Sequence, residues 1–203
     1  NATYNISLTN YGSGAVNDDP CNAILMTLGS SETGDNNCSG FANEPATTPS
    51  CWTAGYKNTV WYKVVAPASG SLKIKTFLNS LTNTQIAVYS GTCGTGLTMV
   101  TSGCNDNSPS CGGLTSLFSE LTVTGLTSGT TYYIAVDGAN DLVGTFSIVA
   151  IDGSTSFPPI AGMDCSAPNP VCASSFSVAD PGYSGYGNTC DLPYPAPVGN
   201  CLS

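Results

Sequence analysis

Residues 86–107 read IAVYSGTCGTGLTMVTSGCNDN, and this stretch decides the fold. Ile86 and Val88 share one face of an alternating segment, which is the pattern of a half-buried β-strand. A tight turn rich in Ser and Gly follows, and the apolar residues of 97–100 then form a returning segment. The stretch therefore predicts a β-hairpin that ends in the polar loop 105–107.

Short segments with strand patterns recur on both sides of this hairpin. We expect strands over residues 3–9, 60–65, 71–77, 117–123, 125–136 and 144–151. In 71–77, apolar residues alternate with Lys73 and Lys75, so both lysines are expected to point to solvent. An apolar run also occupies 23–28, whereas residues 29–56 lack periodicity and are expected to form a long loop.

The many short strands, with no convincing helix, predict a sandwich. Tyr132 follows a Gly129-Thr130 turn, as in a tyrosine corner, in which the hydroxyl binds upstream backbone. The predicted fold class is all-β: an antiparallel, jelly-roll-like β-sandwich cross-linked by disulfides, with a Pro/Gly-rich C-terminal extension.

The two ends of the chain contain similar sequences. Residues 3–6 (TYNI) resemble 145–148 (TFSI), and 19–21 (DPC) resemble 164–165 (DC), at offsets of 142 and 144 residues. Two matches at nearly one offset predict a repeated module. We expect three parts: the last strand of a preceding module or an exchanged strand in 1–15, a β-sandwich module in 16–153, and the Pro-rich start of a further similar module or a tail in 154–203.

The composition excludes several classes of function. The 203 residues carry a net charge of −9, with four lysines, no arginine and no histidine. So few cations argue against nucleic-acid partners and against an anionic membrane surface, and no apolar run is long enough to insert into a membrane. Without histidine, Ser-His-Asp and Cys-His catalysis and histidine metal sites are excluded. We expect no enzyme.

The ten cysteines predict disulfides and an oxidising, extracellular compartment, because there is no CxxC pair or histidine for a zinc site. All ten are expected in disulfides: Cys21, Cys38, Cys51, Cys93, Cys104, Cys111, Cys165, Cys172, Cys190 and Cys201. Spacing leaves the connectivity open. The options are Cys93–Cys104 as the most local pair, Cys38–Cys51 across the long loop, Cys190–Cys201 as its counterpart in the repeat, and Cys165–Cys172.

Residues 16–152 resemble the repeated β-sandwich modules of secreted and surface proteins of Bacteroidota. These modules are similar to bacterial pre-peptidase C-terminal domains and, more distantly, to CUB domains. The motifs that carry the resemblance are NDDPC (17–21), VWYKV (60–64), IAVYSGTC (86–93), CNDN (104–107) and YYIAV (132–136). The resemblance implies a jelly-roll-like sandwich, export, and a role in adhesion, surface assembly or as an appendage of hydrolases, without catalysis. The family commonly has Asp just before the 86–89 strand, where this chain has Asn83-Thr84-Gln85.

Calcium is the one metal that the sequence suggests. No other cofactor is indicated. Its candidate oxygen ligands are Asp18, Asp19, Asn105, Asp106 and Asn107, on loops next to cysteines. The alternative is that these residues only form turns and cap backbone N–H groups. If the family's Asp before the 86–89 strand is a ligand, its absence here argues against calcium.

The aromatic residues suggest ligand binding as a second possibility. Trp52 and Tyr56 lie in the long loop and are candidates for stacking on sugars or peptides, whereas Trp61 in a strand is expected to be core. The expected function is a non-catalytic extracellular structural or adhesive module of a repetitive cell-surface or filament-forming protein. It would act through module–module and strand-edge contacts with other copies or modules. The alternative is a carbohydrate- or substrate-binding accessory domain of a secreted hydrolase, with surface glycans as partners.

Overall fold

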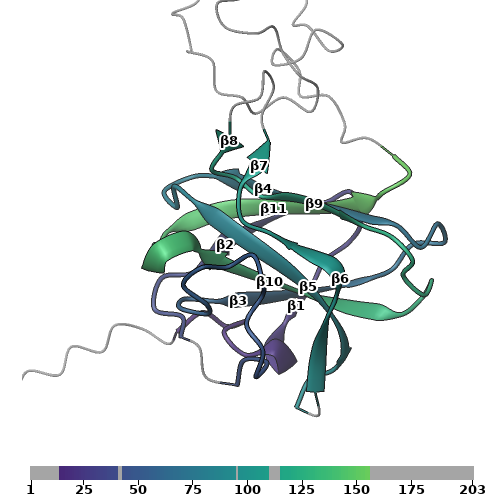
Figure 1. The fold of residues 1–203 in the computed structure, drawn as a ribbon, viewed down its shortest axis with the longest axis horizontal. Coiled ribbons are helices and arrows are strands. Elements are labelled where there is room, and N and C mark those ends of the chain that lie inside the picture. Colours follow the sequence, from purple (N-terminus) through teal and green to yellow (C-terminus); the bar gives the residue numbers. More distant parts are fainter. Residues whose placement is uncertain (1–13, 41–42, 95, 110–114, 156–203) are drawn as a thin grey trace, which may run out of the picture.

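A computed structural model describes residues 14–40, 43–94, 96–109 and 115–155 (Figure 1). The predicted strand 3–9, most of the 1–15 and 154–203 parts, and Cys111, Cys165, Cys172, Cys190 and Cys201 lie outside these residues. The repeat, the C-terminal extension and the Cys165–Cys172 and Cys190–Cys201 pairings therefore stay predictions.

The described residues form two stacked β-sheets (Figure 1). The five-stranded sheet has the order β1 (Ile24–Leu25), β3 (Val60–Val65), β10 (Thr131–Gly138), β5 (Thr84–Thr92) and β6 (Gly96–Asn105). The four-stranded sheet has the order β2 (Ser31–Asp35), β11 (Thr145–Asp152), β4 (Leu72–Leu78) and β9 (Glu120–Val123). A two-stranded sheet joins β7 (Ser108–Pro109) to β8 (Thr115–Ser116), and η1 (Pro20–Asn22) and η3 (Ala139–Asp141) are single 3₁₀ turns.

The predicted all-β sandwich is confirmed, and the chain crosses repeatedly between the two sheets, as in a jelly roll. One pairing departs from the antiparallel prediction. β1 runs parallel to β3, with Ile24 opposite Tyr62. This strand is only two residues long, because η1 and the turn after Met26 limit it at both ends.

The main core lies between the sheets. The five-stranded sheet contributes the alternate residues Ile86, Val88 and Ile134, all fully buried, and the other sheet contributes Phe146 and Ile148. This is the period-2 alternation expected when one face of each strand is buried. The predicted hairpin is confirmed as β5 and β6.

The β5–β6 hairpin contains a large bulge. Ala87 is opposite Cys104 and Tyr89 is opposite Met99, so Val88 alone faces residues 100–103. Ser102 has a positive φ of 55° inside the bulge. Such an irregularity bends the strand and raises its twist.

The predicted tyrosine corner is also confirmed. The backbone N–H of Thr127 donates a hydrogen bond to Tyr132 Oη, at 2.9 Å. The Tyr132 ring packs in the main core, so the residue links the turn to the interior.

Two local predictions are wrong. Residues 29–56 are not entirely loop, since β2 pairs with β11 although its sequence, SETGD, has no apolar alternation. Lys75 does not point into water: it is 4% exposed, and its Nζ lies 4.8 Å from the Phe118 ring centroid and 3.5 Å from Glu120 Oε2. The Phe118 ring and the Glu120 carboxylate take the place of the water molecules that would otherwise hydrate the Lys75 ammonium group.

Candidate functional site

The outer face of the five-stranded sheet is covered by residues 43–59, called here the covering loop. Ala87, Tyr89 and Trp61 form a second buried cluster on this face, and Trp52 of the covering loop packs against them. The confirmed burial of Trp61 follows from its position in β3. This face therefore has a core of its own, separate from the one between the sheets.

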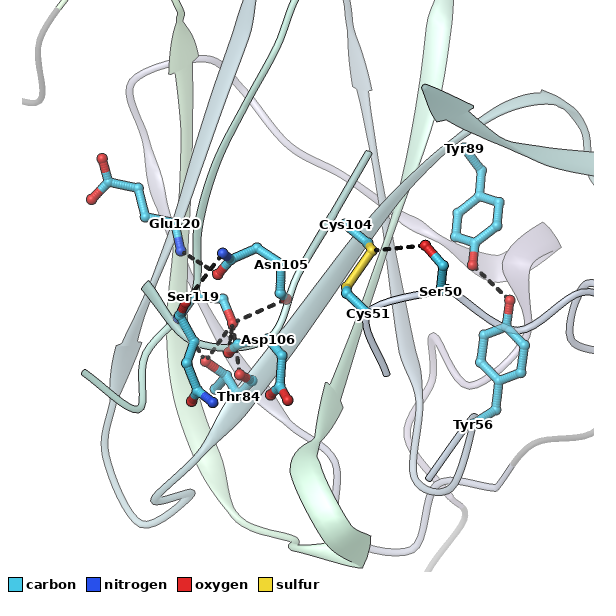
Figure 2. The surroundings of a disulfide bond; sticks show 11 residues. Ser50, Cys51, Tyr56, Thr84, Tyr89, Cys104, Asn105, Asp106, Ser119 and Glu120 are labelled. Atoms are coloured by element: carbon cyan, nitrogen blue, oxygen red, sulfur yellow. Dashed lines mark hydrogen bonds between the residues drawn. A yellow bond between two sulfur atoms is a disulfide. The ribbon is translucent and has the colours of Figure 1, made fainter. Parts of the chain in front are cut away.

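Two disulfides fix the surroundings of this face. Cys51 in the covering loop is bonded to Cys104 of β6, and Cys21 after Asp19 is bonded to Cys93 at the hairpin turn. Figure 2 shows the Cys51–Cys104 bond beside Tyr56 and Tyr89. Both bonds connect segments that are distant in sequence.

The predicted pairs Cys93–Cys104 and Cys38–Cys51 are wrong. Cys104 is opposite Ala87 in the β5–β6 ladder. Cys93 is six residues after Ala87, which puts it about 20 Å from this pair along an extended strand. A disulfide needs Cα atoms within about 7 Å. Cys51 is bonded to Cys104, and Cys38 is exposed and has no disulfide partner in the described part of the chain.

A buried carboxylate holds the end of the covering loop. Asp137 of β10 is fully buried and accepts hydrogen bonds from Lys57 N at 2.8 Å, Asn58 N at 3.1 Å and Thr59 Oγ1 at 3.0 Å. Burial raises the pKa of this carboxyl, and these donors act in the opposite direction. Sequence reasoning missed Asp137, because an aspartate near the end of a strand looks like a turn residue.

A second carboxyl lies under the same loop. Glu44 Oε1 accepts a hydrogen bond from Trp61 Nε1 at 3.2 Å, and its buried Oε2 has no partner among the described residues. Burial raises the pKa of Glu44 from 4.5 to about 8, and repulsion from Asp137, Asp18 and Asp19 adds to the effect. Glu44 is therefore mainly protonated at neutral pH.

Asp18 and Asp19 cap turns. Asp18 Oδ1 accepts from Gly40 N at 2.6 Å, and Asp19 Oδ1 and Oδ2 accept from Cys21 N at 2.7 Å and Asn43 Nδ2 at 2.8 Å. The segment before them lies along β3, where Trp61 N donates to the Asn17 carbonyl. This segment therefore lies beside β3, at the edge of the sheet where β1 also lies. Residues 105–107 follow β6 at the other edge, which is four strand spacings, or about 19 Å, from that segment. The predicted calcium ligands are therefore not brought to one place.

The two aromatic candidates lie mostly inside the protein. Trp52 is 4% exposed and meets the Tyr56 ring edge-on, with the ring centroids 5.6 Å apart. Tyr56 is half-buried, and its hydroxyl lies 2.6 Å from Tyr89 Oη (Figure 2). The expectation that Trp52 offers an open stacking face is wrong, because the loop turns this side chain onto the sheet.

The loop after β6 connects the two sheets. The buried Ser119 hydroxyl donates to the Thr84 carbonyl at 2.6 Å and lies 2.8 Å from the Asp106 carbonyl (Figure 2). Glu120 N donates to Asn105 Oδ1 at 3.2 Å. Asn105 thus has a structural role, whereas the buried Oδ1 atoms of Asp106 and Asn107 have no partner among the described residues.

The outer edge of β6 has no strand partner among the residues that the structure describes. Residues 96–105 (GLTMVTSGCN) contain no charged residue and no proline, and Thr98 is exposed. The other outer strands differ: β1 has two residues, β2 carries Glu32 and Asp35, and β9 has four residues with Glu120 bound to Lys73 at 3.2 Å. Charge, proline and short length are the usual protections of a sheet edge.

No family model and no curated protein matches this chain. Solved structures that are similar to it include the following two. One is the pre-peptidase C-terminal domain of a collagenase from Bacillus anthracis, with 9% identity, a TM-score of 0.38, and coverage of 63% of this chain and 93% of that chain. The other is PliG of Aeromonas hydrophila, a periplasmic inhibitor of g-type lysozyme, with 16% identity, a TM-score of 0.36, and coverage of 63% and 95%. The likeness to Bacteroidota modules and to CUB domains stays a prediction.

Within the described ranges, no helix is long and apolar enough to cross a membrane.

Proposed function

We propose that this chain is a non-catalytic extracellular structural module that joins other copies or modules of the same protein through the outer edge of β6. The observation that carries the proposal is the ten-residue edge strand without charge or proline. The two disulfides support an oxidising compartment, where a cell-surface or filament protein would assemble.

The mechanism is addition of a strand to this edge. An extended segment of a second copy binds the free backbone groups of β6 through main-chain hydrogen bonds. Leu97 and Met99 are half-buried on the outer face beside Tyr133, so they supply apolar contacts for alternate side chains of the added strand. The bulge at residues 100–103 would restrict pairing to the first part of β6.

The alternative, a carbohydrate- or substrate-binding accessory domain, has less support. Its main candidate, Trp52, is buried, and the Tyr56 hydroxyl already contacts Tyr89. Among the described residues, these two rings therefore do not form an open stacking surface.

Sedimentation velocity of the full chain over a concentration series tests the proposal. We expect self-association, weakened at least tenfold by Thr98→Lys, which adds a charge to the exposed edge. Thr124→Lys, at an exposed threonine directly after β9, is the matched control and should leave association unchanged. A wild-type chain that stays monomeric up to millimolar concentration, or equal effects of both lysines, would overturn the proposal.

A further inference from the structure

We infer that Asn83, Asp106 and Asn107 form a calcium site at the start of β5, with Gln85 as a further ligand. The inference does not depend on the proposed function.

Three buried oxygens carry the inference. The Oδ1 atoms of Asn83, Asp106 and Asn107 are each inaccessible to solvent and have no hydrogen-bond partner in the described part of the chain. A buried acceptor without a donor costs about 1–3 kcal/mol, and more when it is charged. Three such atoms in neighbouring loops indicate that something else binds them.

The backbone brings these residues together. The Ser119 hydroxyl lies 2.6 Å from the Thr84 carbonyl and 2.8 Å from the Asp106 carbonyl, so residues 84 and 106 lie side by side. Figure 2 shows Asp106 and Thr84, the residue between Asn83 and Gln85, on the same Ser119 hydroxyl. Asn105 Nδ2 donates to the Asn107 carbonyl at 3.3 Å, which fixes the third ligand next to the second.

Gln85 supplies an independent indication. Its side chain is 1% exposed, and its Nε2 also has no partner among the described residues. Asn105, the last residue of β6, is opposite Ile86, so Gln85 lies next to the residue pair at which the chain leaves β6 for Asp106. Rotation of the amide by half a turn presents Oε1 in place of Nε2, which makes Gln85 an oxygen ligand.

The donor set selects a hard cation. All candidate ligands are carboxylate or amide oxygens, without nitrogen or sulfur donors, which suits calcium. With one carboxylate, affinity should fall in the weak range of extracellular modules, with a Kd of about 10⁻⁴–10⁻³ M.

Thermal unfolding of the full chain, with calcium or with chelator, tests the site. We expect 5 mM calcium to raise the Tm by about 3–5 °C. Asp106→Asn should abolish the shift, because it removes the charge and keeps the shape. Asp18→Asn is the matched control. It removes a carboxylate that the sequence also suggested as a calcium ligand but that lies outside this site, so the calcium response should remain.

A gain-of-affinity variant keeps the test independent of folding defects. Asn83→Asp adds a second carboxylate and should lower the Kd for calcium at least tenfold in calorimetric titration. A buried water would satisfy the same atoms through hydrogen bonds. If wild type and Asn83→Asp show no calcium dependence up to 10 mM of the ion, and Asp106→Asn unfolds at or above the wild-type Tm, the site holds water and the proposal is wrong.

Discussion

The two faces of the five-stranded sheet are covered in different ways. The inner face packs Ile86, Val88 and Ile134 against the other sheet, and its cover is almost entirely apolar. The outer face is covered by a loop with little regular structure, which packs Trp52 and Tyr56 on Tyr89.

The difference lies in what holds each cover in place. Hydrogen-bonded strands position the inner cover, so burial alone suffices there. The covering loop has no ladder, and a disulfide, the Asp137 carboxylate and Glu44 replace it. A loop can thus complete a core, but only with specific contacts whose strength depends on redox state and pH.

Breaking the inner face should have the largest effect. Phe146 is fully buried and meets the Tyr62 ring edge-on at 6.3 Å, so Phe146→Ala should lower the free energy of unfolding by about 4 kcal/mol. Urea denaturation measures the loss. Because the described core cluster around Phe146 contains no cysteine, the loss should be equal with and without reductant; a loss below about 1 kcal/mol would show that the interior is not packed as described.

Removing the covalent link of the outer face should have the next largest effect. Cys51→Ala with Cys104→Ala should lower the free energy of unfolding by about 3 kcal/mol and expose the covering loop to limited proteolysis. Cys38→Ala, at the free thiol, is the control and should change neither property. Unchanged stability and protease resistance in the double variant would mean that the loop is held without the bond.

The pH dependence of stability above pH 4.5 should report on Glu44, under the covering loop. The pKa of Glu44 is raised to about 8 in the folded protein, so the folded state binds more protons than the unfolded state above pH 4.5. Stability should therefore fall as pH rises from about 4.5 to 8, by on the order of 2 kcal/mol. Glu44→Gln should flatten this slope; an equal slope in wild type and Glu44→Gln would contradict the assignment.

The smallest effect is expected at a single hydrogen bond of the inner core. Tyr132→Phe keeps the buried ring but leaves Thr127 N without its acceptor, which should cost about 1 kcal/mol. Chemical denaturation should show the change at every pH between 5 and 9. A pH-dependent loss would place the effect elsewhere.

Much of the fold could be predicted because its signals are local. Alternation in 71–77 and 86–89 has the period of a strand, and the turn before Tyr132 specifies a corner within six residues. Strand β2 was missed for the same reason: SETGD has no alternation, and only pairing with β11 makes it a strand. Close packing of Phe146 on Gly34, where a Cβ would collide with the ring, is likewise invisible in the sequence.

The site was less predictable. The sequence identified Asp106 and Asn107 as candidate oxygen ligands, but it named Asp18 and Asp19 equally, and these lie across the sheet. It treated Trp52 as an exposed ring, although the loop that carries it folds onto the sheet. Donor type is a property of the residue, whereas proximity and burial are properties of the fold.

By itself the sequence determined an all-β chain with a hairpin over 86–100, a tyrosine corner and disulfide chemistry, because strand period, turn residues and cysteine content are written in neighbouring residues. The tertiary structure alone decided which cysteines pair, over 53 and 72 residues, and which carboxyls are buried. It also decided which edge of the sheets lacks a cover within the described residues. These outcomes depend on contacts between distant segments, which exist only once both sheets have formed.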